Sequence, residues 1–326
     1  MSAAPAFIAP CWLRGAHAQT IYASKFCPQP QPAYRRERWH TPDGDFVEVD
    51  SIDAPDAGPH TPWLVLFHGL EGSSRSHYAR TLMQLASDLG WNGAVPHFRG
   101  CGGEPNRLAR AYHSGDTPEV DWILRRLAAR AGDAPVHAVG ISLGGNVLMK
   151  WLGEQGTGAA GVIESAISVC APVDLAAAGA ALERGFARVY AMNFLQTLKA
   201  KALEKLRRFP GLFDAGALAR VRTMRGFDDV FTAPLHGYRD VDDYWTRASC
   251  KPALAAVSVR SLMINALDDP FLPASALPRQ DAVSASITLE YPATGGHVGF
   301  VGGRPPGHTR WLASRVARFL DGTHAG

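Results

Sequence analysis

A serine, a carboxylate and a histidine, which activate one another in acyl transfer, occur in this order along the chain. Ser142 lies in Gly140-Ile-Ser-Leu-Gly144, directly after a stretch at 136–139 that reads as a buried strand. Glycines on both sides of a serine permit a turn so sharp that the serine is strained and its hydroxyl is exposed. The helix that follows points its N-terminus at the place where negative charge collects during acyl transfer. The stretch therefore predicts a strand, a turn with a nucleophilic serine, and a helix from about residue 145 to 152.

The serine motif by itself is weak, because five residues with three fixed recur by chance and a small-residue turn needs no chemistry. A nucleophilic serine also requires a base, an acid that orients the base, and donors for the oxyanion. His297 lies in Gly295-Gly-His-Val-Gly299, on a glycine-flanked loop after the last predicted strand. A histidine there can place its ring between an acid and the serine, so we predict that His297 is the base.

Two adjacent aspartates compete for the role of the acid. Asp268 and Asp269 both follow the predicted strand at 259–266. We choose Asp269, because Asp269-Pro-Phe-Leu-Pro273 has the form of the usual acid turn in hydrolases, and we expect Asp268 to cap the loop. The chain order Ser142, Asp269, His297, with each residue directly after a strand, predicts a catalytic triad.

The oxyanion donors are predicted from backbone positions. The apolar run at 63–67 reads as a strand buried on both faces, and it ends in His68-Gly-Leu70. This is where an α/β-hydrolase keeps its second oxyanion donor, so we assign the N–H of Leu70 to that role beside the N–H of Leu143. Without Ser142 downstream, a simple turn would be the better interpretation of this segment.

Composition excludes several other classes of protein. The 326 residues are 46% hydrophobic and 19% charged, which is ordinary for a soluble globular protein. The net charge of +3 is small and dispersed, which argues against nucleic acid as a partner. Five cysteines without a Cys-x-x-Cys pair argue against a disulfide framework or a zinc site and favour a reducing compartment. Because the first ten residues resemble no signal peptide and no segment is apolar enough to span a membrane, we expect cytoplasmic residence.

Strands and helices alternate over most of the chain, which predicts an α/β fold: one domain over 1–326 with a mostly parallel sheet and helices on both faces. Residues 1–35 are too irregular for a helix face and are predicted to be an arm packed on the surface. Residues 175–250 contain no clear strand and are predicted to be a helical cap inserted over the site. The predicted strands are a hairpin at 36–52 and runs at 63–67, 94–98, 136–139, 162–169, 259–266 and 286–291, and the other helices are at 78–89, 118–130 and 309–320.

Two further segments have competing interpretations. Within the cap, Lys201, Lys205 and Arg208 lie opposite an apolar helix face. We interpret this helix as a lid with a solvated charged side, and we favour that over a helix resting on a membrane surface. The glycine-rich segment 99–105 lacks the spacing of a phosphate-binding loop and is predicted to be a structural loop near the pocket mouth.

Several segments together resemble the YheT-like branch of the α/β-hydrolase superfamily, the group related to plant EMB8-type and animal ABHD-type lipid hydrolases. The resemblance implies a serine hydrolase that acts on small-molecule acyl esters through Ser142, Asp269 and His297, and the acyl-enzyme chemistry requires no metal or other cofactor. A thioesterase or acyltransferase with the same triad, and a non-catalytic ligand-binding homologue, remain open. The resembling segments are 68–74, 98–106, 112–115, 140–146, 265–271 and 295–300.

Overall fold

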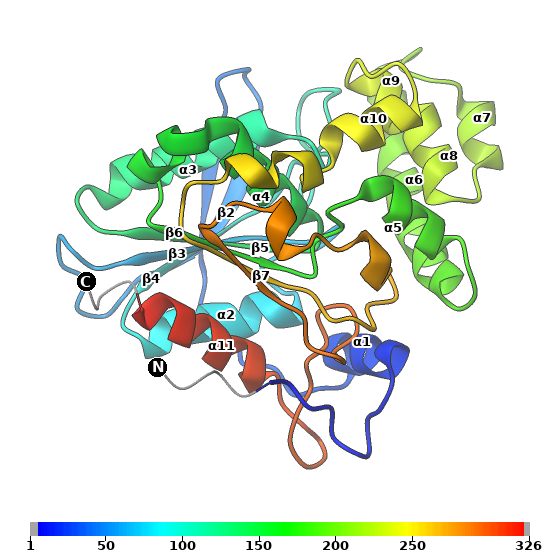
Figure 1. The fold of residues 1–326 in the computed structure, drawn as a ribbon. Helices are drawn as coiled ribbons and strands as arrows, with labels where there is room; N and C mark the ends of the chain where they lie inside the picture. Colours follow the sequence, from blue (N-terminus) through cyan, green and yellow to red (C-terminus); the bar gives the residue numbers. More distant parts are fainter. Residues whose placement is uncertain (1–5, 323–326) are drawn as a thin grey trace.

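The computed structural model describes residues 6–322, and its centre is an eight-stranded sheet (Figure 1). The strand order is β1-β2-β4-β3-β5-β6-β7-β8, and β2 is antiparallel to both of its neighbours while the remaining strands run parallel. The predicted mostly parallel sheet and the predicted hairpin at 36–52 are confirmed. The strand bounds are β1 Arg35–His40, β2 Phe46–Ile52, β3 Trp63–Phe67, β4 Asn92–Pro96, β5 Val136–Ile141, β6 Ser165–Val169, β7 Ser261–Ile264 and β8 Ile287–Glu290.

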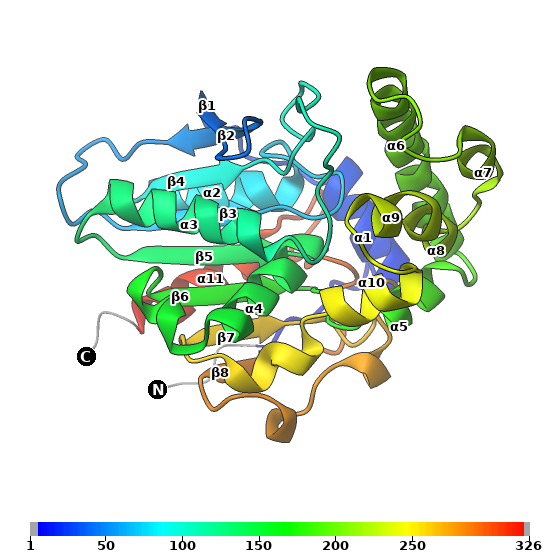
Figure 2. The same cartoon turned by 90° about the horizontal axis from the view of Figure 1, so that it is seen from above.

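Helices cover both faces of the sheet, as Figures 1 and 2 show. α3 (Thr117–Ala131) and α4 (Leu143–Gln155) pack on one face with the short 3-10 helix η3 (Lys251–Ala256), and α2 (His77–Asp88) and α11 (Arg310–Asp321) pack on the other. All five residues of β3 are buried, because helices cover both of its sides. α3 buries Val120, Ile123, Leu124 and Leu127, the i, i+3, i+4, i+7 stripe expected from its sequence.

β4 begins and ends two residues earlier than predicted. Asn92 belongs to the strand and pairs with Trp63, while its side-chain oxygen accepts a hydrogen bond from Ala54 N–H at 3.0 Å. At the other end, Phe98 N–H donates to the ring of His68 at 3.1 Å, so the chain has already turned away from the sheet. Hydrophobicity alone placed the strand over 94–98, because a polar asparagine is not expected inside a buried strand.

The expectation that residues 1–35 form no helix is wrong; residues 1–5 of this arm lie outside the described part. Helix α1 (Ala16–Lys25) lies within it, and the residues that it buries are Gln19, Thr20 and Ala23. Because two of these three are polar and satisfy hydrogen bonds of another loop, the helix has no apolar periodicity to reveal it.

The segment between β6 and β7 is helical and stands beside the sheet (Figure 1). Before η3, which returns to the sheet, it consists of α5 (Leu175–Leu182), α6 (Ala187–Arg208), α7 (Ala215–Arg220), α8 (Met224–Phe227), the π-helical turn η2 (Asp228–Thr232), α9 (Ala233–Leu235) and α10 (Val241–Ala248). Within residues 6–322, no helix combines the length and hydropathy needed to cross a membrane.

Candidate active site

The sharp turn between β5 and α4 holds Ser142 in a conformation that few residues adopt. Its φ is 53° and its ψ is −120°, and it directly precedes the first residue of α4. A Cβ atom at Gly140 would lie 2.6 Å from Gly145 Cα, and one at Gly144 would lie 2.6 Å from the carbonyl carbon of Phe67. Both glycines are therefore required by close backbone approach, which is the physical basis of the motif seen in the sequence.

His297 connects the serine to a carboxylate. Its Nε2 lies 2.9 Å from Ser142 Oγ, and its Nδ1 lies 2.8 Å and 3.1 Å from the two carboxylate oxygens of Asp269. Since the carboxylate can only accept, Nδ1 carries the proton and Nε2 is free to accept from the serine hydroxyl. The three side chains predicted from separate parts of the sequence thus lie in one hydrogen-bonded row, in the order that proton removal from a serine requires.

Asp268 has a different position from its neighbour. Its Oδ1 accepts a hydrogen bond from Gly296 N–H at 2.8 Å, and burial raises the pKa of its carboxyl group. It therefore supports the backbone of the loop that carries His297 without touching the imidazole in this arrangement. Asp269 is the more buried of the two and is 6% exposed.

Helix α1 braces the same loop from outside, which the sequence did not reveal. His297 N–H donates to Thr20 Oγ1 at 2.8 Å, and Val301 N–H donates to Gln19 Oε1 at 2.7 Å. Gln19 also donates to Leu13 O and Val301 O, so its amide ties the arm to the loop. The available signal was only a pair of neighbouring polar residues, Gln19-Thr20, in an arm rich in proline, alanine and aromatic residues.

The two predicted oxyanion donors lie at the serine turn. Leu143 is the first residue of α4 and Leu70 follows β3, and within residues 6–322 neither amide donates a hydrogen bond to another protein group. The Cβ of a residue at position 69 would lie 3.1 Å from Ser142 Cβ, so the Leu70 turn adjoins the nucleophile. Backbone N–H groups in such positions are suited to stabilise an oxyanion.

A cavity of about 260 Å³ opens onto Ser142 and His297. Its walls are mainly apolar and come from both the sheet domain and the helices between β6 and β7. The ring of Phe271 stacks on His297 with centroids 4.0 Å apart, and the ring centroid of Phe194 on α6 lies 6.0 Å from that of Phe271. Phe194 and Lys205 both line the cavity, and the α6 axis rises about 16 Å between them, so the helix borders the cavity over about this length. Apolar lining side chains include Leu70, Leu143, Leu175, Leu182, Phe194, Leu198, Met224, Phe227, Phe231 and Phe271.

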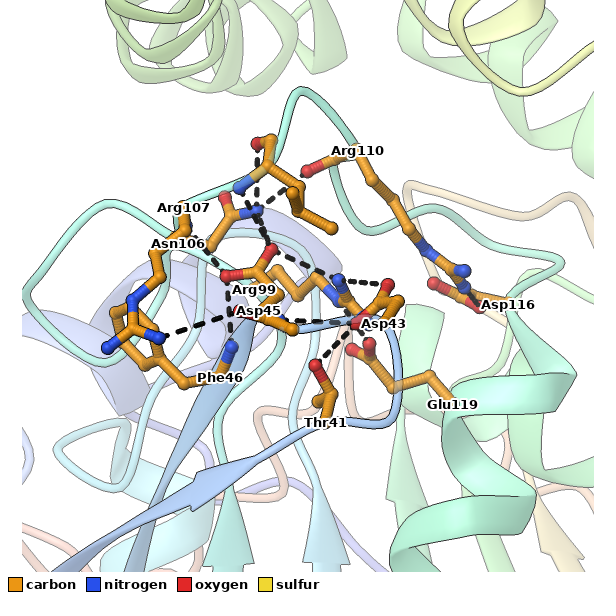
Figure 3. Close-up of polar contacts among 12 residues, drawn as sticks. Thr41, Asp43, Asp45, Phe46, Arg99, Asn106, Arg107, Arg110, Asp116 and Glu119 are labelled. Carbon is orange, nitrogen blue, oxygen red and sulfur yellow. Dashed lines mark hydrogen bonds and ion pairs between the residues drawn. The ribbon is translucent and has the colours of Figure 1, made fainter.

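A buried polar network supports the glycine-rich loop beside this cavity (Figure 3). The guanidinium of Arg99 lies between Asp43, Asp45 and Glu119 and forms an ion pair with each. Asp45 also accepts from the amide of Asn106 at 2.6 Å. Burial, together with the neighbouring Asp116 carboxylate, raises the pKa of Glu119, and the ion pair with Arg99 opposes this shift. The loop is thus held by side chains, in agreement with its interpretation as a structural element.

The charged side of α6 is not simply solvated, contrary to expectation: Lys205 is buried, and Lys201 and Arg208, although more exposed, bind groups of the sheet domain. Lys205 donates to Asn106 Oδ1 at 2.7 Å and to Leu108 O at 2.9 Å, and Arg208 donates to the Asn106 carbonyl at 2.8 Å. Lys201 forms an ion pair with Glu71 at 2.7 Å. Burial lowers the pKa of Lys205 to about 8. A helical charge pattern alone does not distinguish water from polar loop atoms as the partner, and here the cations fasten α6 to the sheet domain.

One group of described residues has the composition of a metal site. The ligand atoms of Cys170, Asp269 and His297 all lie within 4.8 Å of one another. However, Asp269 and His297 share a hydrogen bond, and Cys170 Sγ accepts from Val298 N–H at 3.3 Å. Burial raises the pKa of the Cys170 thiol well above its usual value. We therefore interpret Cys170 as a packed thiol that supports the histidine loop.

Comparison with known proteins agrees with this geometry. A model of the alpha/beta hydrolase fold matches residues 62–303, so the chain belongs to the α/β-hydrolase fold family. Within it, the chain is 42% identical over 306 residues to the Escherichia coli (strain K12) protein "Putative esterase YheT", covering 93% of this chain and 89% of that one. It is also 30% identical over 318 residues to mouse phospholipase ABHD3, covering 95% and 76%. The resemblance to this branch and the predicted fold class are confirmed.

A solved structure supports the fold independently. The esterase Pf2001 of Pyrococcus furiosus superposes with a TM-score of 0.56 over 97% of this chain and 98% of that one. Only 14% of the residues are identical, so this similarity concerns the fold alone.

Proposed function

We propose that this protein is a serine hydrolase that cleaves carboxylic esters of small molecules through an acyl-enzyme. The observation that carries the proposal is the position of His297, 2.9 Å from Ser142 Oγ and 2.8 Å from an oxygen of Asp269, in the wall of a largely apolar cavity that Ser142 also lines. The names of relatives, an esterase and a phospholipase, agree with ester cleavage.

In the proposed mechanism, Ser142 Oγ attacks the ester carbonyl carbon while its proton passes to His297 Nε2. The N–H groups of Leu70 and Leu143 bind the oxyanion, and Asp269 stabilises the imidazolium through Nδ1. His297 then protonates the leaving alcohol, which departs and leaves an acyl ester on Ser142. Water activated by the same histidine cleaves this ester and restores the serine.

The proposed substrate has an apolar acyl chain that lies along α6. Burial of apolar surface favours such a chain by about 0.8 kcal/mol for each methylene group. We further propose that the whole chain 1–326 is one domain, in which 175–250 is the cap and 1–35 the arm. Cytoplasmic residence and the absence of nucleic acid as a partner also remain proposals; five free cysteines support a reducing compartment.

The proposal is tested with p-nitrophenyl esters from acetate to long-chain acyl, alongside acyl-CoA and with added alcohol acceptors. Hydrolysis of the oxygen esters that is lost in Ser142→Ala supports it. Preference for acyl-CoA would indicate a thioesterase, and acyl transfer to the alcohol in preference to water would indicate an acyltransferase. Binding of esters without turnover would indicate a non-catalytic homologue.

A further inference from the structure

The turn that carries the oxyanion donor Leu70 contains an unusual glutamate. Glu71 has a φ of 55°, in the left-handed region that glycine adopts more readily. Gly72 N–H donates to Gly69 O at 2.9 Å, which closes a tight turn around residues 70 and 71. A non-glycine residue persists in such a conformation only when its surroundings hold it there.

Two side chains hold Glu71. Its backbone N–H donates to Tyr112 Oη at 2.9 Å, and the Tyr112 hydroxyl donates to Glu71 Oε1 at 2.8 Å. The ammonium of Lys201, on α6, donates to the same oxygen at 2.7 Å. The Glu71 side chain is 11% exposed, so these contacts are made largely out of water. The backbone and the side chain of one residue are therefore both fixed.

The position of this group connects it to the site. Leu70 lines the cavity together with Tyr112 and Lys201. The Gly69 turn adjoins Ser142. The Leu70 N–H belongs to the Gly69–Leu70 peptide unit, directly before the Leu70–Glu71 unit that Tyr112 holds, so a change of conformation at Glu71 would shift this turn and move the Leu70 N–H from the place where the oxyanion forms. An oxyanion donor is effective only when it is already aimed at that place.

We infer that Glu71 is a positioning residue that aims the Leu70 N–H, and that Lys201 links this aim to helix α6. The inference rests on the proposed function. Lys201 would then do more than anchor α6. Its ammonium also offsets the negative charge of the Glu71 carboxylate, which would otherwise repel the negative charge that forms at the oxyanion. The same interaction makes the oxyanion site dependent on the placement of α6.

The neighbouring Cys101 is not part of this assignment. Its sulfur lies 3.6 Å from Lys201 Nζ, but burial raises the pKa of the thiol to about 11. It therefore stays protonated near neutral pH and is a poor nucleophile.

The test compares Glu71→Ala, Lys201→Met and Glu71→Gln with Arg208→Met. Arg208 also fastens α6 to a loop, through the carbonyls of Asn106 and Arg107, but has no contact with residues 69–72. The readouts are kcat and KM for p-nitrophenyl butyrate and the Ki of 1,1,1-trifluoroheptan-2-one. This ketone adds to a catalytic serine to form a tetrahedral oxyanion, so its Ki reports the oxyanion site directly.

We expect Glu71→Ala and Lys201→Met to lower kcat about 10- to 100-fold with little change in KM, because loss of a whole oxyanion donor costs about 10²- to 10³-fold. The Ki of the ketone should rise in parallel. Glu71→Gln retains an oxygen acceptor and should stay within about threefold of wild type, as should Arg208→Met. If Glu71→Ala does not fold, Lys201→Met decides by the same criteria.

The inference is overturned if Glu71→Ala retains kcat within about threefold, if Arg208→Met loses as much as Lys201→Met, or if kcat falls while the ketone Ki is unchanged. The last result would mean that the glutamate only stabilises the fold. Failure of the proposed function has a different signature, because wild type itself would then neither hydrolyse the ester nor be inhibited by the ketone, and both proposals would fall.

Discussion

Replacement of Asp269 by asparagine distinguishes the two adjacent aspartates most sharply. Asp269 Oδ1 accepts from Phe271 N–H at 2.8 Å as well as from His297 Nδ1. In Asp269→Asn the amide oxygen should take the place facing Phe271 N–H, because only an oxygen can accept there. The amide NH2 then faces Nδ1 and forces it to accept. The imidazole proton moves to Nε2, which can no longer take the proton of Ser142.

The expected loss follows from this tautomer change. A triad with the wrong tautomer loses on the order of 10⁴-fold in kcat, which corresponds to about 5 kcal/mol of transition-state stabilisation. Asp268→Asn is the matched control. Its amide oxygen still accepts from Gly296 N–H, and the change from a charged to a neutral acceptor costs about 1 kcal/mol, which is less than about tenfold in rate.

The assay is kcat for p-nitrophenyl butyrate hydrolysis, with the midpoint of thermal unfolding of each variant as a check on folding. A crippled Asp268→Asn beside a mildly affected Asp269→Asn would refute the choice of acid. Equal small losses in both variants would refute the view that a carboxylate must orient His297.

Three further outcomes are expected. Gly144→Ala should cost about 1–3 kcal/mol of stability in urea unfolding and remove most ester hydrolysis, since its Cβ would lie 2.6 Å from the carbonyl carbon of Phe67; wild-type stability and activity would contradict the required close approach. Thr20→Val should leave His297 N–H without its acceptor, costing about 1–3 kcal/mol of stability and lowering kcat, and unchanged unfolding and kcat would argue against a brace. Burial lowers the pKa of Lys205 from 10.5 to about 8, so the unfolded chain binds more protons between these values and stability rises with pH there. The unfolding free energy of wild type relative to Lys205→Met should accordingly increase by about 2 kcal/mol from pH 7.5 to 9.5, and a flat difference would mean that burial does not perturb this ammonium.

The position of the candidate triad could be predicted because its signals are local. Each member follows a strand, and the carboxyl ends of parallel strands meet at one edge of a sheet, so the chain order of Ser142, Asp269 and His297 implies their approach. The turn at Ser142 depends on Gly140 and Gly144, because the neighbouring backbone lies too close to either residue for a side chain to fit. The choice between two neighbouring aspartates rested on a turn pattern, and the structure gives the two residues different partners.

The supporting residues could not be predicted, because their partners are distant in sequence. Thr20 acts on a backbone N–H at residue 297, and nothing in a short window of α1 reports that contact. Likewise, Lys201 and Lys205 look like a solvated helix face until the loops that accept their hydrogen bonds are placed beside them. The positive φ of Glu71 is equally invisible, since glutamate carries no preference for it.

The most direct test of the central claim is reaction of the folded protein with a fluorophosphonate, followed by peptide mass spectrometry. We expect a single adduct on Ser142 whose formation is strongly slowed in His297→Ala, because the phosphonylating attack needs the same proton acceptor as ester cleavage. Folded wild-type protein that remains unlabelled, or carries its adduct on another residue, would contradict the claim that His297 and Asp269 make Ser142 a nucleophile.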